Sequence, residues 1–127
     1  MSVIISSTKS GFPALPFEAM KNDILGRSYQ LSLSFVGETR GRRLNQETRG
    51  KSYVPNVLSF PLSESAGEIY ITGAVAKREA HKWDHTYKEH VAFLFIHGLL
   101  HLKGHDHGEE MEKLEARWLK KYRNKTT

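Results

Sequence analysis

The sequence predicts a single α+β domain, and three observations support this. Its 127 residues suit one hydrophobic core. Some segments alternate apolar and polar side chains as strands do, and others repeat apolar residues every three or four positions as helices do. The strands come mostly first and the helices mostly last, which is typical of α+β folds. We therefore expect residues 1–127 to form one compact domain.

The strand signals are short. Residues 29–36 alternate apolar and polar side chains, which is the pattern of a half-buried strand. The apolar residues 3–5 are a candidate first strand. Residues 57–60 and 68–71 are two more, and we expect a turn rich in Pro, Ser and Gly over residues 61–67 to separate them.

Helices are predicted where apolar residues recur every three or four positions. Residues 16–25 are the first such segment, and the Arg-rich residues 38–49 are expected to form a second helix that carries Leu44 inward. Thr72 is a suitable N-cap for a third. The last predicted helix, over about residues 108–122, is amphipathic. Its apolar stripe consists of Met111, Leu114, Trp118 and Tyr122.

The most distinctive predicted helix covers residues 86–102. Thr86 and Glu89 have the spacing of a capping box at its start, and Gly104 provides its end. Residues 91–102 are apolar almost all round the helix, which predicts that the helix is buried.

Composition restricts the chemistry that the chain can perform. The absence of cysteine excludes disulfides, thiol catalysis and thiolate metal sites. No apolar run approaches the roughly 20 residues that span a bilayer, and the first residues lack the features of a secretory signal. We therefore expect no membrane partner and a cytoplasmic location, or an organellar one in a eukaryote. A net charge of +5 suits an anionic partner such as nucleic acid, although many soluble proteins are equally basic.

Three histidines form the main candidate site. His97 and His101 are four residues apart on the predicted helix, so their side chains lie about 5–6 Å apart on one face. This spacing lets two imidazoles share one zinc ion. Gly104 can reverse the chain and return His107 as a third ligand. Three protein ligands and an open position are typical of catalytic zinc, so we predict a hydrolase with one Zn²⁺ per chain.

The neighbouring residues leave several roles open. Metalloproteases with this histidine spacing carry a general-base Glu at the position of Gly98, which argues against a peptidase. His90 is either a second-shell group of the metal site or a residue of the helix start. Asp106 either orients a ligand imidazole or stabilises the turn. His81 and His85 are interpreted as surface residues.

Residues 97–107 resemble the H-G-x-L-H-L-x-G-Y-D-H pattern of the YbeY-type rRNA maturation endoribonucleases, with His105 where Tyr is usual. Three further segments match in the expected order. Residues 44–50 resemble the family's L-N-x-x-x-R segment, residues 56–61 its V-L-S-F-P strand, and residues 67–69 its G-D-I. Pro55 stands where the family usually has Thr, and the resemblance covers roughly residues 29–122.

The resemblance implies a function and a site. His97, His101 and His107 would be the zinc ligands, and Arg49 would be the functional arginine near the metal. The substrate class would be single-stranded RNA, chiefly small-subunit rRNA during maturation and ribosome quality control. The implied fold packs a zincin-like, metal-bearing helix on a four-stranded mixed sheet, with several further helices. The departures at His105 and Pro55 lie beside the site and bear on fine specificity.

On this interpretation, zinc activates a water or polarises the phosphate while Arg49 stabilises the developing phosphoryl charge. A second set of basic residues would contact the RNA backbone without reading its sequence. These residues are Arg40, Arg42, Arg43 and Lys51. Tyr53 and Tyr70 would either stack on a base or serve packing alone. Ribosomal proteins or assembly factors are candidate partners.

Two other functions fit parts of the sequence. One is a zinc peptidase, suggested by the histidine spacing alone. The other is a non-enzymatic ribosome-assembly or RNA-binding factor in which the zinc is structural, because no general base is visible in the sequence.

Overall fold

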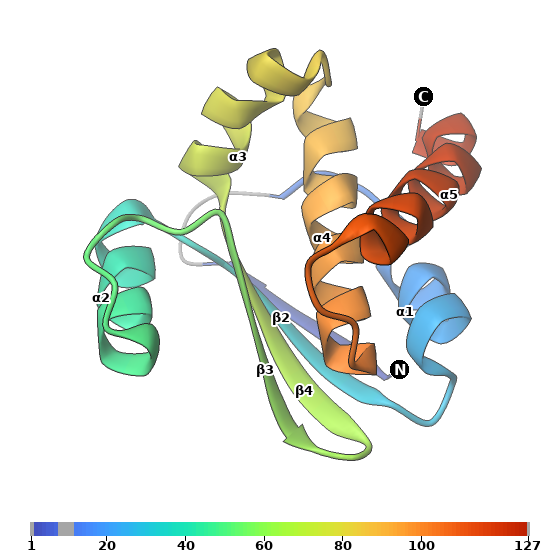
Figure 1. Ribbon diagram of the computed structural model, residues 1–127, viewed down its shortest axis with the longest axis horizontal. Helices are drawn as coiled ribbons and strands as arrows, with labels where there is room; N and C mark the ends of the chain where they lie inside the picture. Colours follow the sequence, from blue (N-terminus) through green and yellow to red (C-terminus); the bar gives the residue numbers. More distant parts are fainter. Residues whose placement is uncertain (1, 8–11, 127) are drawn as a thin grey trace.

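A computed structural model describes residues 2–7 and 12–126 of the chain, with side chains described up to residue 123. Four strands and five α-helices are joined by short loops and one 3-10 helix (Figure 1). In chain order they are β1 (Val3–Ser7), α1 (Phe17–Leu25), β2 (Gln30–Val36), α2 (Glu38–Arg49), β3 (Val57–Ser63), β4 (Ala66–Thr72), α3 (Gly73–Ala80), η1 (His81–Trp83), α4 (Tyr87–Lys103) and α5 (Glu109–Thr126).

The strands form one mixed sheet in the order β1-β2-β4-β3. β1 and β4 both pair with β2 in parallel, and β3 pairs with β4 in antiparallel fashion. In β2 the residues that alternate toward one face, including Leu31 and Leu33, are buried. Leu33 pairs with Ile69 of β4, so the central strands present a continuous apolar surface. The predicted α+β class and the four-stranded mixed sheet are confirmed.

Helix α4 packs on this apolar surface and contacts β3, β4 and the helices α1, α3 and α5 (Figure 1). The predicted capping box is present: the Glu89 backbone N–H donates to Thr86 Oγ1 at 3.1 Å, and the Thr86 N–H donates to Glu89 Oε1 at 3.0 Å. Gly104 ends the helix with a left-handed φ of 110°. Helix α2 lies apart from the others, on the opposite side of the sheet in Figure 1.

Several local expectations differ from the structure. The turn expected over residues 61–67 is shorter, because β3 continues to Ser63 and β4 begins at Ala66. Pro61 is accommodated because β3 is an edge strand, where a missing N–H breaks no pairing. In α2 the buried residues are Gly41 and Asn45, whereas Leu44 is only partly buried.

The early helices also alternate with the strands instead of following them, because each parallel pairing of strands requires a connection that crosses the sheet. Thr72 stands at the N-cap of α3, but its side chain makes no capping hydrogen bond within the described part of the chain.

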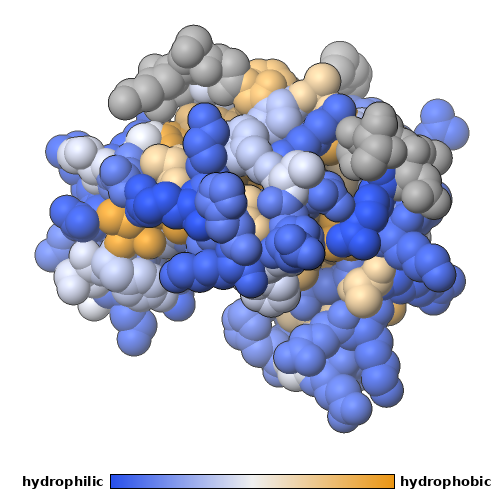
Figure 2. Space-filling model, turned by 90° about the horizontal axis from the view of Figure 1, so that it is seen from above, coloured by the Kyte–Doolittle hydropathy of each residue, from blue (hydrophilic) through white to orange (hydrophobic). Residues whose placement is uncertain are grey.

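The molecular surface seen from above Figure 1 is mostly hydrophilic, with small separate hydrophobic areas (Figure 2). Among the described residues, no helix has the length and apolar character needed to cross a membrane.

Candidate metal centre

The three predicted histidines lie together in the structure. Their ligand atoms all lie within 4.8 Å of one another. His97 and His101 project from the same face of α4, and their Nε2 atoms are 3.1 Å apart. His107 joins them from the turn after the helix, with its ring 5.0 Å from that of His97 and 4.7 Å from that of His101.

The turn that returns His107 depends on Gly104. Its N–H donates to the His101 carbonyl at 3.0 Å, and the His105 N–H donates to the Leu100 carbonyl at 3.0 Å. These bonds close the helix while the positive φ of Gly104 turns the chain back, as the sequence predicted. His97 and His101 are partly buried and His107 is exposed, so the cluster has one side open to solvent.

Glu115 of α5 contacts His97, the first of the three histidines. This carboxylate is 7% exposed, and its Oε2 lies 2.5 Å from His97 Nδ1. A carboxylate in this position accepts the Nδ1 proton, which leaves the lone pair of Nε2 facing His101 and His107. Burial lowers the pKa of His101, and His97 and His107 lower it further, so this imidazole is neutral near pH 7.

The donor set fits a zinc ion. Two nitrogens on a tetrahedral zinc at about 2.0–2.1 Å are separated by about 3.3–3.4 Å, close to the 3.1 Å between the two Nε2 atoms. The carboxylate behind His97 is the usual outer partner of a zinc-bound imidazole. Three imidazole nitrogens leave one position of a tetrahedral site for water or substrate.

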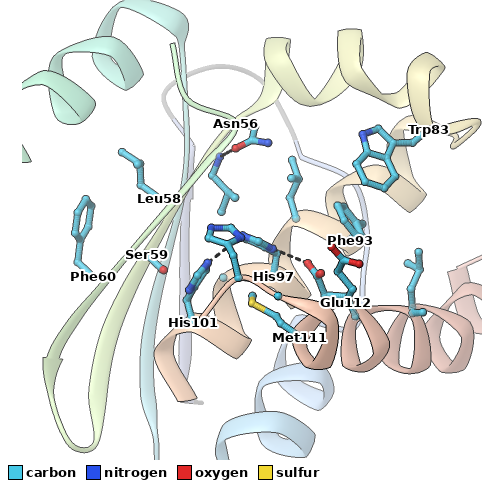
Figure 3. A pocket seen from close by; sticks show the side chains of 18 of the residues that line it. Asn56, Leu58, Ser59, Phe60, Trp83, Phe93, His97, His101, Met111 and Glu112 are labelled. Carbon is cyan, nitrogen blue, oxygen red and sulfur yellow. Dashed lines mark hydrogen bonds and ion pairs between the residues drawn. The ribbon is translucent and has the colours of Figure 1, made fainter. Parts of the chain in front are cut away.

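The cluster lies in an open pocket of about 990 Å³ that β3, α4, α5, η1 and the end of α2 enclose (Figure 3). Arg49 lines this pocket together with the three histidines. Its Nη1 donates to Asn45 Oδ1 at 3.0 Å and to the Tyr53 hydroxyl at 3.3 Å. Asn45 is fully buried and also donates to the Tyr53 carbonyl at 3.0 Å, so it fixes both the arginine and the loop beside it.

The other basic residues of the sequence prediction are placed differently. Of the described residues that line the pocket, Arg49 is the only member of the basic set. The remaining members are exposed and lie on or just after α2, outside the pocket lining: Arg40, Arg42, Arg43 and Lys51.

Neither His90 nor Asp106, the two residues expected to support the three histidines, makes a described hydrogen bond to one of them. His90 is fully buried, and its described hydrogen bonds join it to Glu79 and His85 instead of to the ligand histidines. Asp106 is exposed and has no hydrogen bond among the described side chains, so its contribution is electrostatic, on the pKa of His101. His85, expected at the surface, is partly buried and lines the pocket. His81 is exposed as expected.

Sequence reasoning missed Glu115. The signal was present, because Glu115 stands four residues after Met111 and four before Leu119, on the apolar face of α5. A carboxylate on such a face requires a polar partner, and His97 supplies it.

Comparison with known proteins gives a consistent result. Residues 12–123 match the family model described as Endoribonuclease YbeY. Three curated relatives carry that name. The one from Aromatoleum aromaticum is 44% identical over 71% of this chain and 64% of its own length. That from Mesoplasma florum is 40% identical over 84% of this chain and 64% of its own. The relative from Alkaliphilus metalliredigens is 33% identical over 91% of this chain and 78% of its own length.

The chain thus spans about 64% of the length of several of these relatives. The solution structure of TM1509 from Thermotoga maritima is similar in fold, with a TM-score of 0.67 and 23% identity, and the match covers 97% of this chain and 90% of that one. With a family model matched over nearly its whole length and relatives of this similarity, the chain belongs to the YbeY endoribonuclease family.

Proposed function

We propose that the protein is a zinc-dependent endoribonuclease that cleaves single-stranded RNA, and that it acts on small-subunit rRNA during maturation and quality control. The observation that carries this proposal is one open pocket containing both the three histidines and Arg49. The names of the relatives support RNA as the substrate, and so does a net charge of +5.

The relatives come from bacteria, where rRNA is processed in the cytoplasm, and we place the protein there. Ribosomal proteins or assembly factors would then be its neighbours.

In this proposal, Glu115 and Asn45 position the groups that act on the RNA. When bound, zinc supplies Lewis acidity and lowers the pKa of water toward neutrality. Glu115 keeps the proton of His97 on Nδ1, so that Nε2 serves as a ligand. Asn45 holds Nη1 of Arg49, which leaves Nε and Nη2 to donate to two phosphate oxygens. These donors would stabilise the negative charge that grows on the phosphoryl group in the transition state.

The peptidase alternative has weak support, because the site has no room for its general base. A Cβ atom on Gly98 would lie 2.9 Å from Cδ1 and 3.3 Å from Cγ1 of Ile69. Helix α4 touches the sheet at this point, so the carboxylate that peptidases carry here would be forced against β4. The structural-zinc alternative is disfavoured by the exposure of His107 and by the open pocket in front of the three histidines.

Cleavage of a defined single-stranded RNA by the zinc-loaded protein tests the proposal. His101→Ala should retain the fold, as judged by circular dichroism, and should lose both zinc and cleavage. Arg49→Ala should retain zinc and lose about 100-fold in rate, while Arg27→Ala, at an exposed arginine outside the pocket lining, should change the rate little. Cleavage that survives in His101→Ala, or loss of zinc in Arg49→Ala, would contradict the assigned roles. Unfolding of His101→Ala would support structural zinc.

A further inference from the structure

One wall of the pocket is aromatic and is not part of the metal centre. Trp83, His85 and Phe93 line this wall, which η1 and the first turns of α4 build (Figure 3). The ring centroid of Trp83 lies 4.9 Å from that of Phe93 and 6.1 Å from that of His85, with an interplanar angle of 24° to His85. Even so, Trp83 is 53% exposed. A large indole is therefore packed against Phe93 and His85, contributes to the pocket lining and keeps about half of its surface exposed.

The backbone around Trp83 is fixed. Asp84 follows it in a left-handed conformation with φ of 58°, and the His85 N–H donates to the Ala80 carbonyl at 2.9 Å. This turn sets the orientation of Trp83 and His85 relative to each other. The exposed indole is thus held in place and does not belong to a long loop.

A chain of hydrogen bonds that runs through the buried His90 reaches His85. Glu79 accepts from Asn56 Nδ2 at 3.2 Å and lies 3.1 Å from His90 Nε2. Because the carboxylate can only accept, His90 donates from Nε2, and in its neutral tautomer Nδ1 is an acceptor. The Nδ1 of His85 lies 3.0 Å from Nδ1 of His90, so in this arrangement His85 donates from Nδ1.

The remaining nitrogen of His85, Nε2, is left as a hydrogen-bond acceptor on the side of the ring away from His90. Burial lowers the pKa of His85, and the nearby His90 lowers it further, which keeps the imidazole neutral near pH 7. The wall thus combines a flat aromatic surface with one acceptor, and a hydrogen-bond chain through His90, Glu79 and Asn56 sets how His85 is protonated.

We propose that Trp83 and His85 form a nucleotide subsite, in which the indole stacks on a base and His85 Nε2 accepts a hydrogen bond from the same nucleotide. The inference rests on the proposed function, because it takes single-stranded RNA as the ligand. Stacking on exposed aromatic side chains is the usual way in which proteins bind unpaired bases. Phe93 lies between Trp83 and His97 in Figure 3, with its ring 6.5 Å from that of His97. The base would therefore belong to a nucleotide beside the one at the metal centre.

The test is a double-mutant cycle between the side chain and the base. The dissociation constant of a short single-stranded RNA is measured by fluorescence anisotropy, with wild type and with Trp83→Ala. Both are measured again with oligonucleotides that lack one base at successive positions. Trp83→Ala should weaken binding of the complete RNA about 5- to 150-fold, and Trp83→Phe should retain most of the affinity. At one position of the RNA, removing the base should weaken binding to the wild-type protein by a similar factor. The same removal should hardly change binding to Trp83→Ala.

Lys82→Ala is the matched control, because Lys82 is exposed in the same 3-10 helix but does not line the pocket. Its affinity should equal that of wild type, and the zinc content of all variants should be unchanged. Binding losses that are additive at every position would overturn the subsite. Equal weakening by Lys82→Ala would also overturn it, because the effect would then come from a disturbed 3-10 helix.

The two proposals can fail separately. If wild type binds RNA with the expected coupling but does not cleave it, the subsite stands and the proposed activity is wrong. If wild type cleaves RNA without any coupling to Trp83, the activity stands and the subsite is wrong. If the protein does not bind single-stranded RNA with or without zinc, both are wrong.

Discussion

Glu115 reaches His97 from a different helix, and this contact separates what local sequence can predict from what it cannot. The placement of His97 and His101 on one face follows from helix geometry alone, and that of His107 beside them from the reversal at Gly104. The carboxylate that orients His97 depends on how α5 packs against α4. Asp106, which is closer in sequence, was one candidate for this role, with turn stabilisation as its alternative; tertiary packing instead places Glu115, 18 positions away, against His97.

Replacing Glu115 should therefore weaken metal binding without unfolding the protein. Glu115→Gln keeps the shape of the side chain but removes the charge that stabilises the His97 Nδ1 proton, and should lower zinc affinity about 10- to 100-fold. Glu112→Gln is the matched control, since Glu112 lines the pocket from the same helix but is exposed and makes no described contact with a ligand histidine. Competition with a chromophoric chelator measures both affinities. Equal affinities for the two variants would show that Glu115 does not support the ligand.

At the scale of elements, prediction succeeded where the determinants are local. The caps of α4, its burial and its end at Gly104 all follow from residues within or next to the helix. The length of β3 could not be predicted in this way, because Pro61 is tolerated only at the edge of a sheet whose strand order the sequence does not reveal. The places where two elements approach closely could not be predicted from the sequence either. Gly67 of β4 lies against Tyr29 and Leu102, so the need for a residue without a side chain at this position arises from tertiary packing.

Gly67→Ala should destabilise the protein, because the added methyl group would overlap the Tyr29 hydroxyl and press on Leu102. The expected loss in the free energy of unfolding is about 1–3 kcal/mol, the usual cost of overpacking a core. Tyr29→Phe removes the overlapping oxygen, so in the double variant the loss from Gly67→Ala should be smaller than in wild type. Urea denaturation of the four proteins measures the coupling. Additive effects of the two changes would mean that Tyr29 is not the obstacle.

At the scale of the whole molecule, the site is assembled from segments far apart in the chain. Arg49 from the end of α2, the histidines from α4 and its turn, and Glu115 from α5 meet only in the folded domain. The pairing of Arg49 with the histidines was expected only from the family resemblance, because no local pattern connects residues so distant. The aromatic wall at Trp83 was not expected, since burial and exposure there depend on how η1 meets α4.

Helices α5 and α1 are joined by Tyr122 of α5, whose hydroxyl donates a hydrogen bond to Asp23 of α1. Burial raises the pKa of Tyr122 well above its ordinary value of about 10, and Asp23 raises it further. Above pH 10 the unfolded chain releases this proton and the folded chain keeps it. The stabilisation is therefore complete below about pH 10 and declines above it, by about 1.4 kcal/mol per pH unit.

Tyr122→Phe lacks both the hydrogen bond and this titration. It should be less stable than wild type at pH 8, by about 1–2 kcal/mol, and the difference should shrink as the pH is raised from 10 to 11. Chemical denaturation at each pH gives the two curves. A difference that stays constant across this range would show that Tyr122 is not held in its protonated form by the fold.

In the proposed mechanism the three histidines hold the metal on which RNA cleavage depends. The test is a titration of metal-free protein with zinc, in which the bound metal and the initial rate of cleavage of a single-stranded RNA are measured in the same samples. The rate should rise in proportion to bound zinc and reach its plateau at one ion per chain. Full cleavage by metal-free protein, or a rate that continues to rise beyond one bound ion, would contradict this mechanism.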